Sequence, residues 1–101
     1  MIRNAYVRKI EERLDRLTRE IDSVRSRAGE FTADARARFN RQLDEIRVQA
    51  ETVRKRVREV RDARTSDWGR LKKGVDEALD ELKRSIDSAI QRLRKTGSDD
   101  R

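Results

Sequence analysis

Carboxylates and arginines supply most of the chemistry available to this chain, because its 101 residues include no cysteine and no histidine. A Cys/His metal site and a disulfide framework are therefore excluded, and no side chain titrates near neutral pH at its unperturbed pKa. Adjacent carboxylates, which could share acid–base work, occur at Glu11-Glu12, Asp44-Glu45, Asp76-Glu77 and Asp80-Glu81. Neighbours along a helix do not face each other, and basic residues lie three or four positions from each pair. We expect no enzymatic activity, no cofactor and no small-molecule substrate.

The glycines Gly69 and Gly74 have the spacing of a phosphate-binding loop. The Lys-Ser/Thr pair that completes such a loop is missing, since Val75 and Asp76 follow instead. The surrounding pattern is also helical, without the preceding strand that a phosphate loop requires. We therefore do not interpret these glycines as a nucleotide site.

An arginine stripe is the remaining candidate for binding chemistry. The formal net charge is +7, from 27 basic and 20 acidic residues, and the excess is greatest around residues 54–64. Such an excess can attract nucleic acid or anionic lipid. It is equally typical of a solvated helix face laced with salt bridges. The candidate anion-binding stripe consists of Arg47, Arg54, Arg58 and Arg61.

The element that carries these residues must be a long amphipathic helix. Apolar residues recur at alternating steps of three and four, which is the heptad pattern of a coiled coil. The pattern passes through Gly29 without losing phase and shifts by a four-residue insertion near Phe39. It predicts a helix over about 3–63. The first seam comprises Val7, Ile10, Leu14, Leu17, Ile21, Val24 and Phe31.

The C-terminal third has a broader apolar face, which is typical of a helix that touches two or more neighbours. Thr65, Ser66 and Asp67 favour a helix start, and they predict a turn near 64–67, a second helix over about 67–95 and a disordered tail at 96–101. Trp68 is either a large core residue closing the turn or a membrane-interface anchor. The predicted helix-packing core comprises Ile46, Val53, Val57, Val60, Trp68, Leu71, Val75, Leu79, Leu82 and Ile86.

Two shapes remain open for residues 1–95, which we expect to form a single all-α coiled-coil domain. The unbroken period favours one extended rod, whereas the turn signals favour a hairpin. In the hairpin the arginine stripe would face the acidic flank of the second helix, pairing Arg54 with Asp80, Arg47 with Asp87 and Arg58 with Asp76. Either shape leaves the seam of residues 7–31 without a partner in its own chain. The sequence therefore predicts a homo-oligomer, most simply a dimer.

Several short tracts resemble a family of small, highly hydrophilic bacterial coiled-coil stress-response proteins. In the second half they are Ser66-Asp67-Trp68, Leu71-Lys72, Gly74-Val75-Asp76, Ala78, Leu82, Ile86 and Ala89. In the first half they are Tyr6-Val7, Lys9, Leu14, Glu20-Ile21-Asp22 and Ala33-Asp34-Ala35-Arg36-Ala37. The resemblance implies a bacterial, cytoplasmic protein without enzymatic activity that is linked to stress, and it implies no catalytic or binding residues.

These observations lead to two functional hypotheses. The first is a structural or stress-protective coiled coil that acts through self-association. The second is a basic amphipathic-helix protein that binds an anionic membrane surface or nucleic acid non-specifically. No apolar run is long enough to predict a membrane span.

Overall fold

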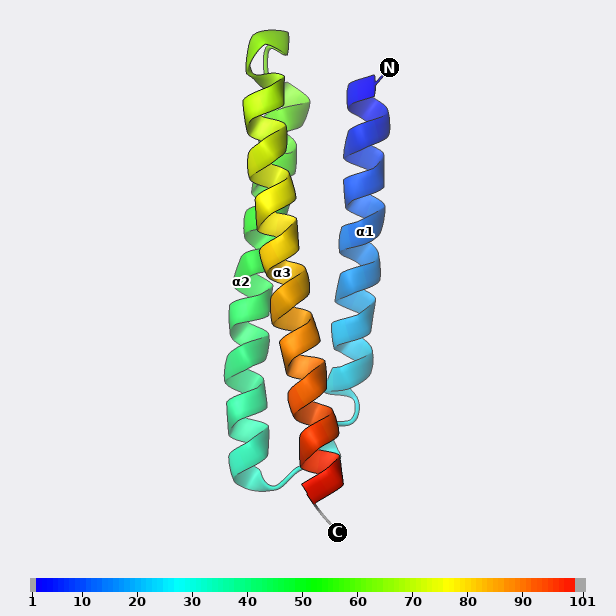
Figure 1. Cartoon of the computed structure of the whole chain (residues 1–101), viewed down its shortest axis with the longest axis vertical. Helices are drawn as coiled ribbons and strands as arrows, with labels where there is room; N and C mark the ends of the chain where they lie inside the picture. Colours follow the sequence, from blue (N-terminus) through cyan, green and yellow to red (C-terminus); the bar gives the residue numbers. More distant parts are fainter. Residues whose placement is uncertain (1, 100–101) are drawn as a thin grey trace.

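The computed structural model describes residues 2–99 as three helices joined by short connections (Figure 1). Helix α1 covers Ile2–Arg25, α2 covers Ala33–Asp62 and α3 covers Thr65–Asp99, and a single 3-10 turn, η1, covers Ala28–Glu30. The N-terminus of α1 lies at the same end of the molecule as the α2–α3 turn, so the helices run alternately down, up and down. The all-α fold class is thus confirmed, with the predicted hairpin present as α2 and α3.

The helices enclose one core that runs along the bundle. The Cα atoms extend over 56 × 19 × 15 Å, so the core is long and narrow. No charged or polar residue is buried in the described part of the chain. The buried residues are Val7, Ile10, Leu14, Leu17, Ile21 and Val24 in α1, Phe39, Leu43, Ile46, Ala50, Val53, Val57 and Val60 in α2, and Val75, Leu79, Leu82, Ile86 and Ala89 in α3.

The predicted helix over 3–63 is wrong, because the chain breaks at residues 26–32. Thr32 is the N-cap of α2, with extended backbone (φ −62°, ψ 163°), and its hydroxyl accepts a hydrogen bond of 3.2 Å from the backbone N–H of Ala35. A side-chain acceptor at this position satisfies one of the free N–H groups of the first helical turn. The heptad pattern does not reveal this break, because α1 and α2 both pack the same seam against one shared core.

The break gives the first seam a partner within its own chain. Val7 to Val24 of that seam are buried against α2 and α3, and Phe31 is half-buried beside the core. The premise that this seam needs a second chain to cover it is therefore wrong. Of the predicted helix-packing core, Trp68 and Leu71 are half-buried, and the other eight residues are buried.

The second turn lies close to its predicted place. Helix α2 ends at Asp62, Ala63 is its C-cap with extended backbone, and α3 begins at Thr65 rather than 67. Asp67 then lies in the first turn of α3, where a carboxylate interacts favourably with the helix dipole. At the other end α3 continues to Asp99, so the predicted disordered tail is wrong for residues 96–99, while 100–101 lie outside the described residues. A helix can continue past its last packed turn where no proline stops it.

Candidate functional site

Three residues of the arginine stripe lie on the flank of α2 that faces α1, whereas Arg47 lies beside Val48 and Glu51 of its own helix. Arg54, Arg58 and Arg61 line a shallow groove together with Glu11 and Asp15 of α1. The groove continues past Asn4 and Arg8 toward the N-terminus of α1. Its floor is apolar and is formed by Val7, Leu14 and Val57. Arg58 and Arg61 are exposed, and Arg54 is half-buried.

The hairpin pairs expected between the stripe and α3 are therefore wrong. Arg54 instead bonds Glu51 of its own helix, with 2.8 Å between Nη1 and Oε1, and Arg47 lies 3.5 Å from Asp44. The physical reason is that α1 packs on the side of α2 where a hairpin of only two helices would place α3. Exposed pairs three residues apart on one helix contribute only about 0.3–0.5 kcal/mol each. Within residues 2–99 neither Arg58 nor Arg61 makes a salt bridge.

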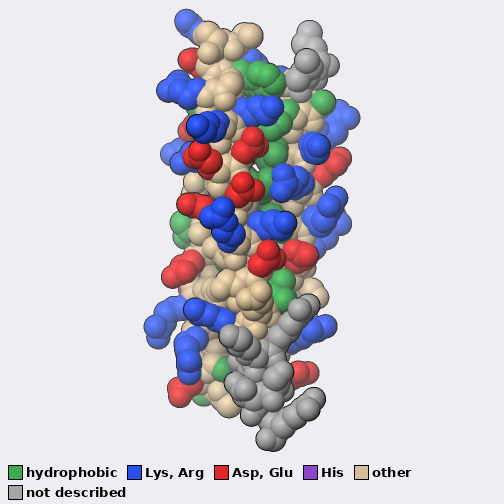
Figure 2. Space-filling model, in the orientation of Figure 1, with side chains coloured by type: hydrophobic (Ala, Val, Ile, Leu, Met, Phe, Trp, Pro, Cys, Tyr) green, Lys and Arg blue, Asp and Glu red, His purple; other side chains and the backbone are tan. Residues whose placement is uncertain are grey.

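Folding concentrates positive charge at one end of the bundle. The basic end is defined here as the end of the bundle that holds the α2–α3 turn, and it comprises residues 2–14, 54–64 and 65–74. The groove between α1 and α2 and the contact between Arg56 and Gly74 show that these three segments lie side by side at the same height along the bundle. The basic end carries 13 basic and 5 acidic residues, a net charge of +8, whereas the rest of the chain carries 14 basic and 15 acidic residues. Figure 2 shows basic and acidic side chains interspersed along the face in view, with apolar side chains visible mainly in gaps between them.

Tyr6 and Trp68 form an aromatic cluster that attaches α1 to α3 at the basic end. Their rings meet edge to face, with centroids 6.3 Å apart. The Tyr6 hydroxyl donates to Asp76 Oδ1 at 2.7 Å and lies 3.2 Å from the backbone carbonyl of Lys72. The Lys72 ammonium lies 5.0 Å from the Tyr6 ring centroid and 5.4 Å from that of Trp68, within cation–π range. Trp68 is half-buried and packs against the core at the end of the bundle that holds the α2–α3 turn.

The environment of Tyr6 shifts its titration. Burial raises the pKa of Tyr6 well above its ordinary value, and the hydrogen bond to Asp76 and the negative charge of that carboxylate act in the same direction. The heptad pattern does not identify this site, because Tyr6 only flanks the apolar seam at Val7. The feature of the sequence that points to this site is the position of Tyr6 directly beside the seam, where an aromatic ring can reach a neighbouring helix.

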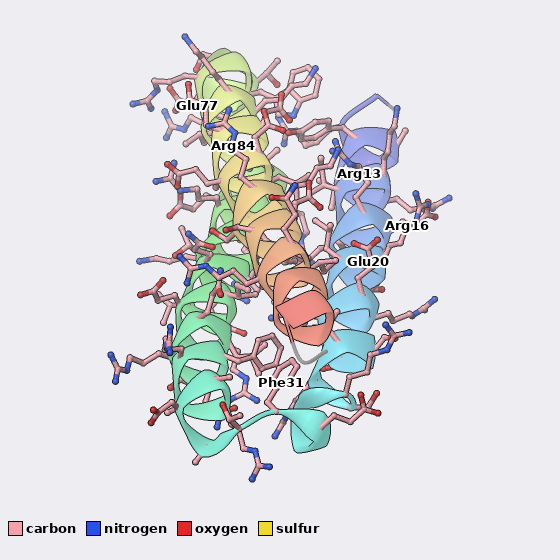
Figure 3. The ribbon with its side chains drawn as sticks, turned by 60° about the horizontal axis from the view of Figure 1, so that its bottom comes forward. Arg13, Arg16, Glu20, Phe31, Glu77 and Arg84 are labelled. Carbon is pink, nitrogen blue, oxygen red and sulfur yellow. The ribbon has the colours of Figure 1, made fainter. Side chains whose placement is uncertain are left out.

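The adjacent carboxylates do not converge on a catalytic cleft. Asp76 accepts the hydrogen bond from the Tyr6 hydroxyl. Glu77 and Arg84 project outward from α3 (Figure 3). Among the side chains that the structure describes, no group of three metal-ligating residues comes together. In the same part of the chain, no helix is both long and apolar enough to cross a lipid bilayer. The charged surface is therefore the candidate functional site.

No family model, curated protein or solved structure matches this chain. The resemblance to small hydrophilic bacterial stress-response proteins accordingly stays a prediction based on its own residues.

Proposed function

We propose that this protein is a non-enzymatic binding protein that holds the phosphate backbone of duplex nucleic acid on its basic end. The observation that carries the proposal is the net charge of +8 gathered at one end of a chain whose remainder carries a small acidic excess. Clustered Lys and Arg release the condensed counterions of a nucleic acid when they neutralise phosphates. Such binding depends on backbone charge and does not read base sequence.

The stripe has dimensions that suit a phosphate backbone. Arg54 and Arg61 are seven positions apart on α2, which corresponds to about 10 Å along a helix that rises about 1.5 Å per residue. Phosphates along one strand of B-form DNA advance about 3.4 Å each along the duplex axis. The segment from Arg54 to Arg61 therefore spans about three phosphates, and the exposed guanidinium groups of Arg58 and Arg61 are suited to bidentate contact with phosphate oxygens.

The described surface favours nucleic acid over a membrane. An interfacial helix binds lipid by inserting an apolar face, but the apolar faces of these helices line the core. Among the side chains that the structure describes, Val48, at 67% exposure, is the exposed large apolar one. Insertion of an apolar helix face into a bilayer would require the bundle to open, whereas binding to phosphates requires only the surface already present.

The first functional hypothesis, a self-associating coiled coil, has lost its main argument because the α1 seam is covered within the chain. The stress-related role and the cytoplasmic location that the resemblance implies remain predictions. A nucleic-acid-binding role is compatible with a cytoplasmic location.

The test is fluorescence anisotropy of a labelled, mixed-sequence DNA duplex over a series of salt concentrations. Binding should weaken with a log–log slope of about −3, since each neutralised phosphate contributes about 0.9. The triple variant Arg54→Gln, Arg58→Gln, Arg61→Gln should lose most of that slope.

A matched control separates location from net charge. The triple variant Arg38→Gln, Arg41→Gln, Arg84→Gln removes the same charge from exposed positions outside the basic end. It should keep the slope of the unmodified protein. Absence of binding at low salt would overturn the proposal, as would equal losses in the two triple variants. Binding to anionic vesicles with none to the duplex would favour the membrane hypothesis instead.

A further inference from the structure

The connection between α1 and α2 is close to helical. The backbone N–H of Ser26 bonds the carbonyl of Asp22 at 3.2 Å, as in an α-helix, and Arg27 bonds Val24 at 3.0 Å. Glu30 bonds Arg27 at 3.1 Å within the 3-10 turn η1. No residue among 2–99 has a positive φ, and the chain contains no proline. Thr32, with its extended ψ of 163°, is the clear departure from helical backbone in this connection.

The sequence of this connection also fits a helix. Val24, Ala28, Phe31 and Ala35 follow one another at steps of four, three and four, which keeps the heptad pattern intact across the break. An added Cβ at Gly29 would meet nothing within 4 Å. A sequence that suits both a break and a continuous helix can adopt either one, depending on the contacts around it.

Three contacts hold the connection in its bent form. The Thr32 hydroxyl caps α2. The Arg36 guanidinium donates to the carbonyls of Gly29 and Phe31 at 3.3 and 3.4 Å. The rings of Phe31 and Phe39 meet edge to face with centroids 5.7 Å apart, and Phe31 lies at the connection end of the bundle (Figure 3). In a continuous helix these two rings would be separated by about 12 Å along the axis, so this contact belongs to the bent form alone.

Helix α1 is also the least enclosed of the three helices. Its core side chains remain 3–9% exposed, whereas the five buried residues of α3 are fully buried. The hydrogen bonds from its side chains to α3 in the described residues come from Tyr6, close to its N-terminus. Release of α1 would therefore leave the α2–α3 pair in place and expose one apolar groove of matching shape.

We propose that two copies of this chain exchange α1: residues 26–32 become helical, α1 and α2 join into one helix over 2–62, and each α1 packs on the α2–α3 hairpin of the other copy. The exchanged dimer is closed and symmetric, and it repeats the interface of the single chain. The contacts that differ between the exchanged dimer and the single chain are those of residues 26–32. The partner is a second copy because the released groove is the one that α1 fills in the single chain. This inference does not depend on the proposed binding of nucleic acid.

Ala33→Pro tests the exchange without disturbing the single-chain bundle. Ala33 is the exposed first residue of α2, a position that accepts proline. Thr32 before it already has the extended backbone that a following proline favours. In a continuous helix over 2–62 the same proline would remove one backbone hydrogen bond and clash with the preceding turn. This variant should therefore stay monomeric.

The opposite variant combines Gly29→Ala with Thr32→Ala. It raises the helix propensity of the connection and removes the cap, so it should favour the exchanged dimer. Each protein is unfolded in urea, refolded at near-millimolar concentration and measured by light scattering and small-angle X-ray scattering. We expect the unmodified chain to show some dimer, the double variant to show several times more, and Ala33→Pro to show none. The dimer should be markedly longer than the single chain.

The proposal would be overturned by equal dimer fractions in Ala33→Pro and the unmodified chain, because a dimer that tolerates this proline does not contain the continuous helix. It would equally be overturned if the double variant remained as monomeric as Ala33→Pro. Circular dichroism of each variant at low concentration verifies that the three-helix bundle itself has folded.

Discussion

The hydroxyl of Tyr6 donates a hydrogen bond of 2.7 Å to a carboxylate oxygen of Asp76, across 70 positions of the chain. The bond joins the start of α1 to α3 beside the edge-to-face contact with Trp68. It is the most specific sign in the described structure that α1 docks on its own hairpin in one register. Tyr6 lies beside the heptad seam and not in it, and yet its hydrogen bond fixes where α1 packs.

Removing this hydroxyl should weaken the bundle. Tyr6→Phe keeps the ring but deletes the hydrogen bond, and a bond to a charged group contributes about 1.5–3 kcal/mol where it is well formed. Because Asp76 is exposed, we expect a loss of about 1 kcal/mol, near the average for hydrogen bonds in proteins. Urea unfolding followed by circular dichroism measures the loss. In the Asp76→Ala background, which removes the acceptor, the same substitution should cost less, and an equal cost in both backgrounds would show that the hydrogen bond to Asp76 contributes nothing.

Stability should depend on alkaline pH through the same residue. The pKa of Tyr6 is raised in the folded state above the ordinary value of about 10. The unfolded chain then releases its phenol proton first, so the contribution of Tyr6 is complete below about pH 10 and is lost as the pH rises toward the folded-state pKa. Unfolding midpoints measured from pH 8 upward should fall more steeply for the unmodified chain than for Tyr6→Phe. Parallel curves for the two proteins would contradict this assignment.

Truncation of the α1 seam should destabilise the single chain. Leu17→Ala removes a side chain that is 9% exposed, and Leu82→Ala removes one that is fully buried. Leucine-to-alanine changes in a core cost about 2–5 kcal/mol, and Leu17 should fall near the lower limit because its site is more open. Val48→Ala, at an exposed position, should change stability by less than about 0.5 kcal/mol. If Leu17→Ala altered only the dimer fraction and left the unfolding midpoint unchanged, the seam would not be part of the single-chain core.

Gly74→Ala should be tolerated despite a close neighbour. A Cβ at this position would lie 2.9 Å from Nη1 of Arg56, but that atom ends a flexible, exposed side chain that can move. Alanine then gains about 0.5–1 kcal/mol over glycine inside a helix, as Gly69→Ala should also do in its open surroundings. Thermal unfolding compares the two variants. A loss of stability in Gly74→Ala alone would show that the Arg56 contact with the Gly74 carbonyl helps to hold α2 against α3.

The sequence was sufficient to predict the helices but not the number of helices. Heptad spacing identified the residues that form the core, and Thr65, Ser66 and Asp67 marked the second turn closely. The first break stayed hidden because Val24, Phe31 and Ala35 keep one phase through it. Its local signal was Thr32, which caps α2, but a single threonine without a shift in the apolar pattern is a weak sign.

The candidate site could be predicted as a set of residues but not as a surface. Arg54, Arg58 and Arg61 share one flank of α2 in any helical arrangement. Which helix that flank faces depends on a third helix that the heptad pattern did not separate from α2. The clustering of charge at one end depends on the same fact, because residues 2–14 join residues 54–74 only when α1 folds back.

The central claim is that α1 is buried within its own chain, and hydrogen–deuterium exchange at low micromolar concentration tests it most directly. Amides of residues 7–24 should exchange slowly, with protection that stays the same when the protein is diluted further. The account would be contradicted if these amides exchanged at random-coil rates in dilute solution and became protected only as the protein concentration rose.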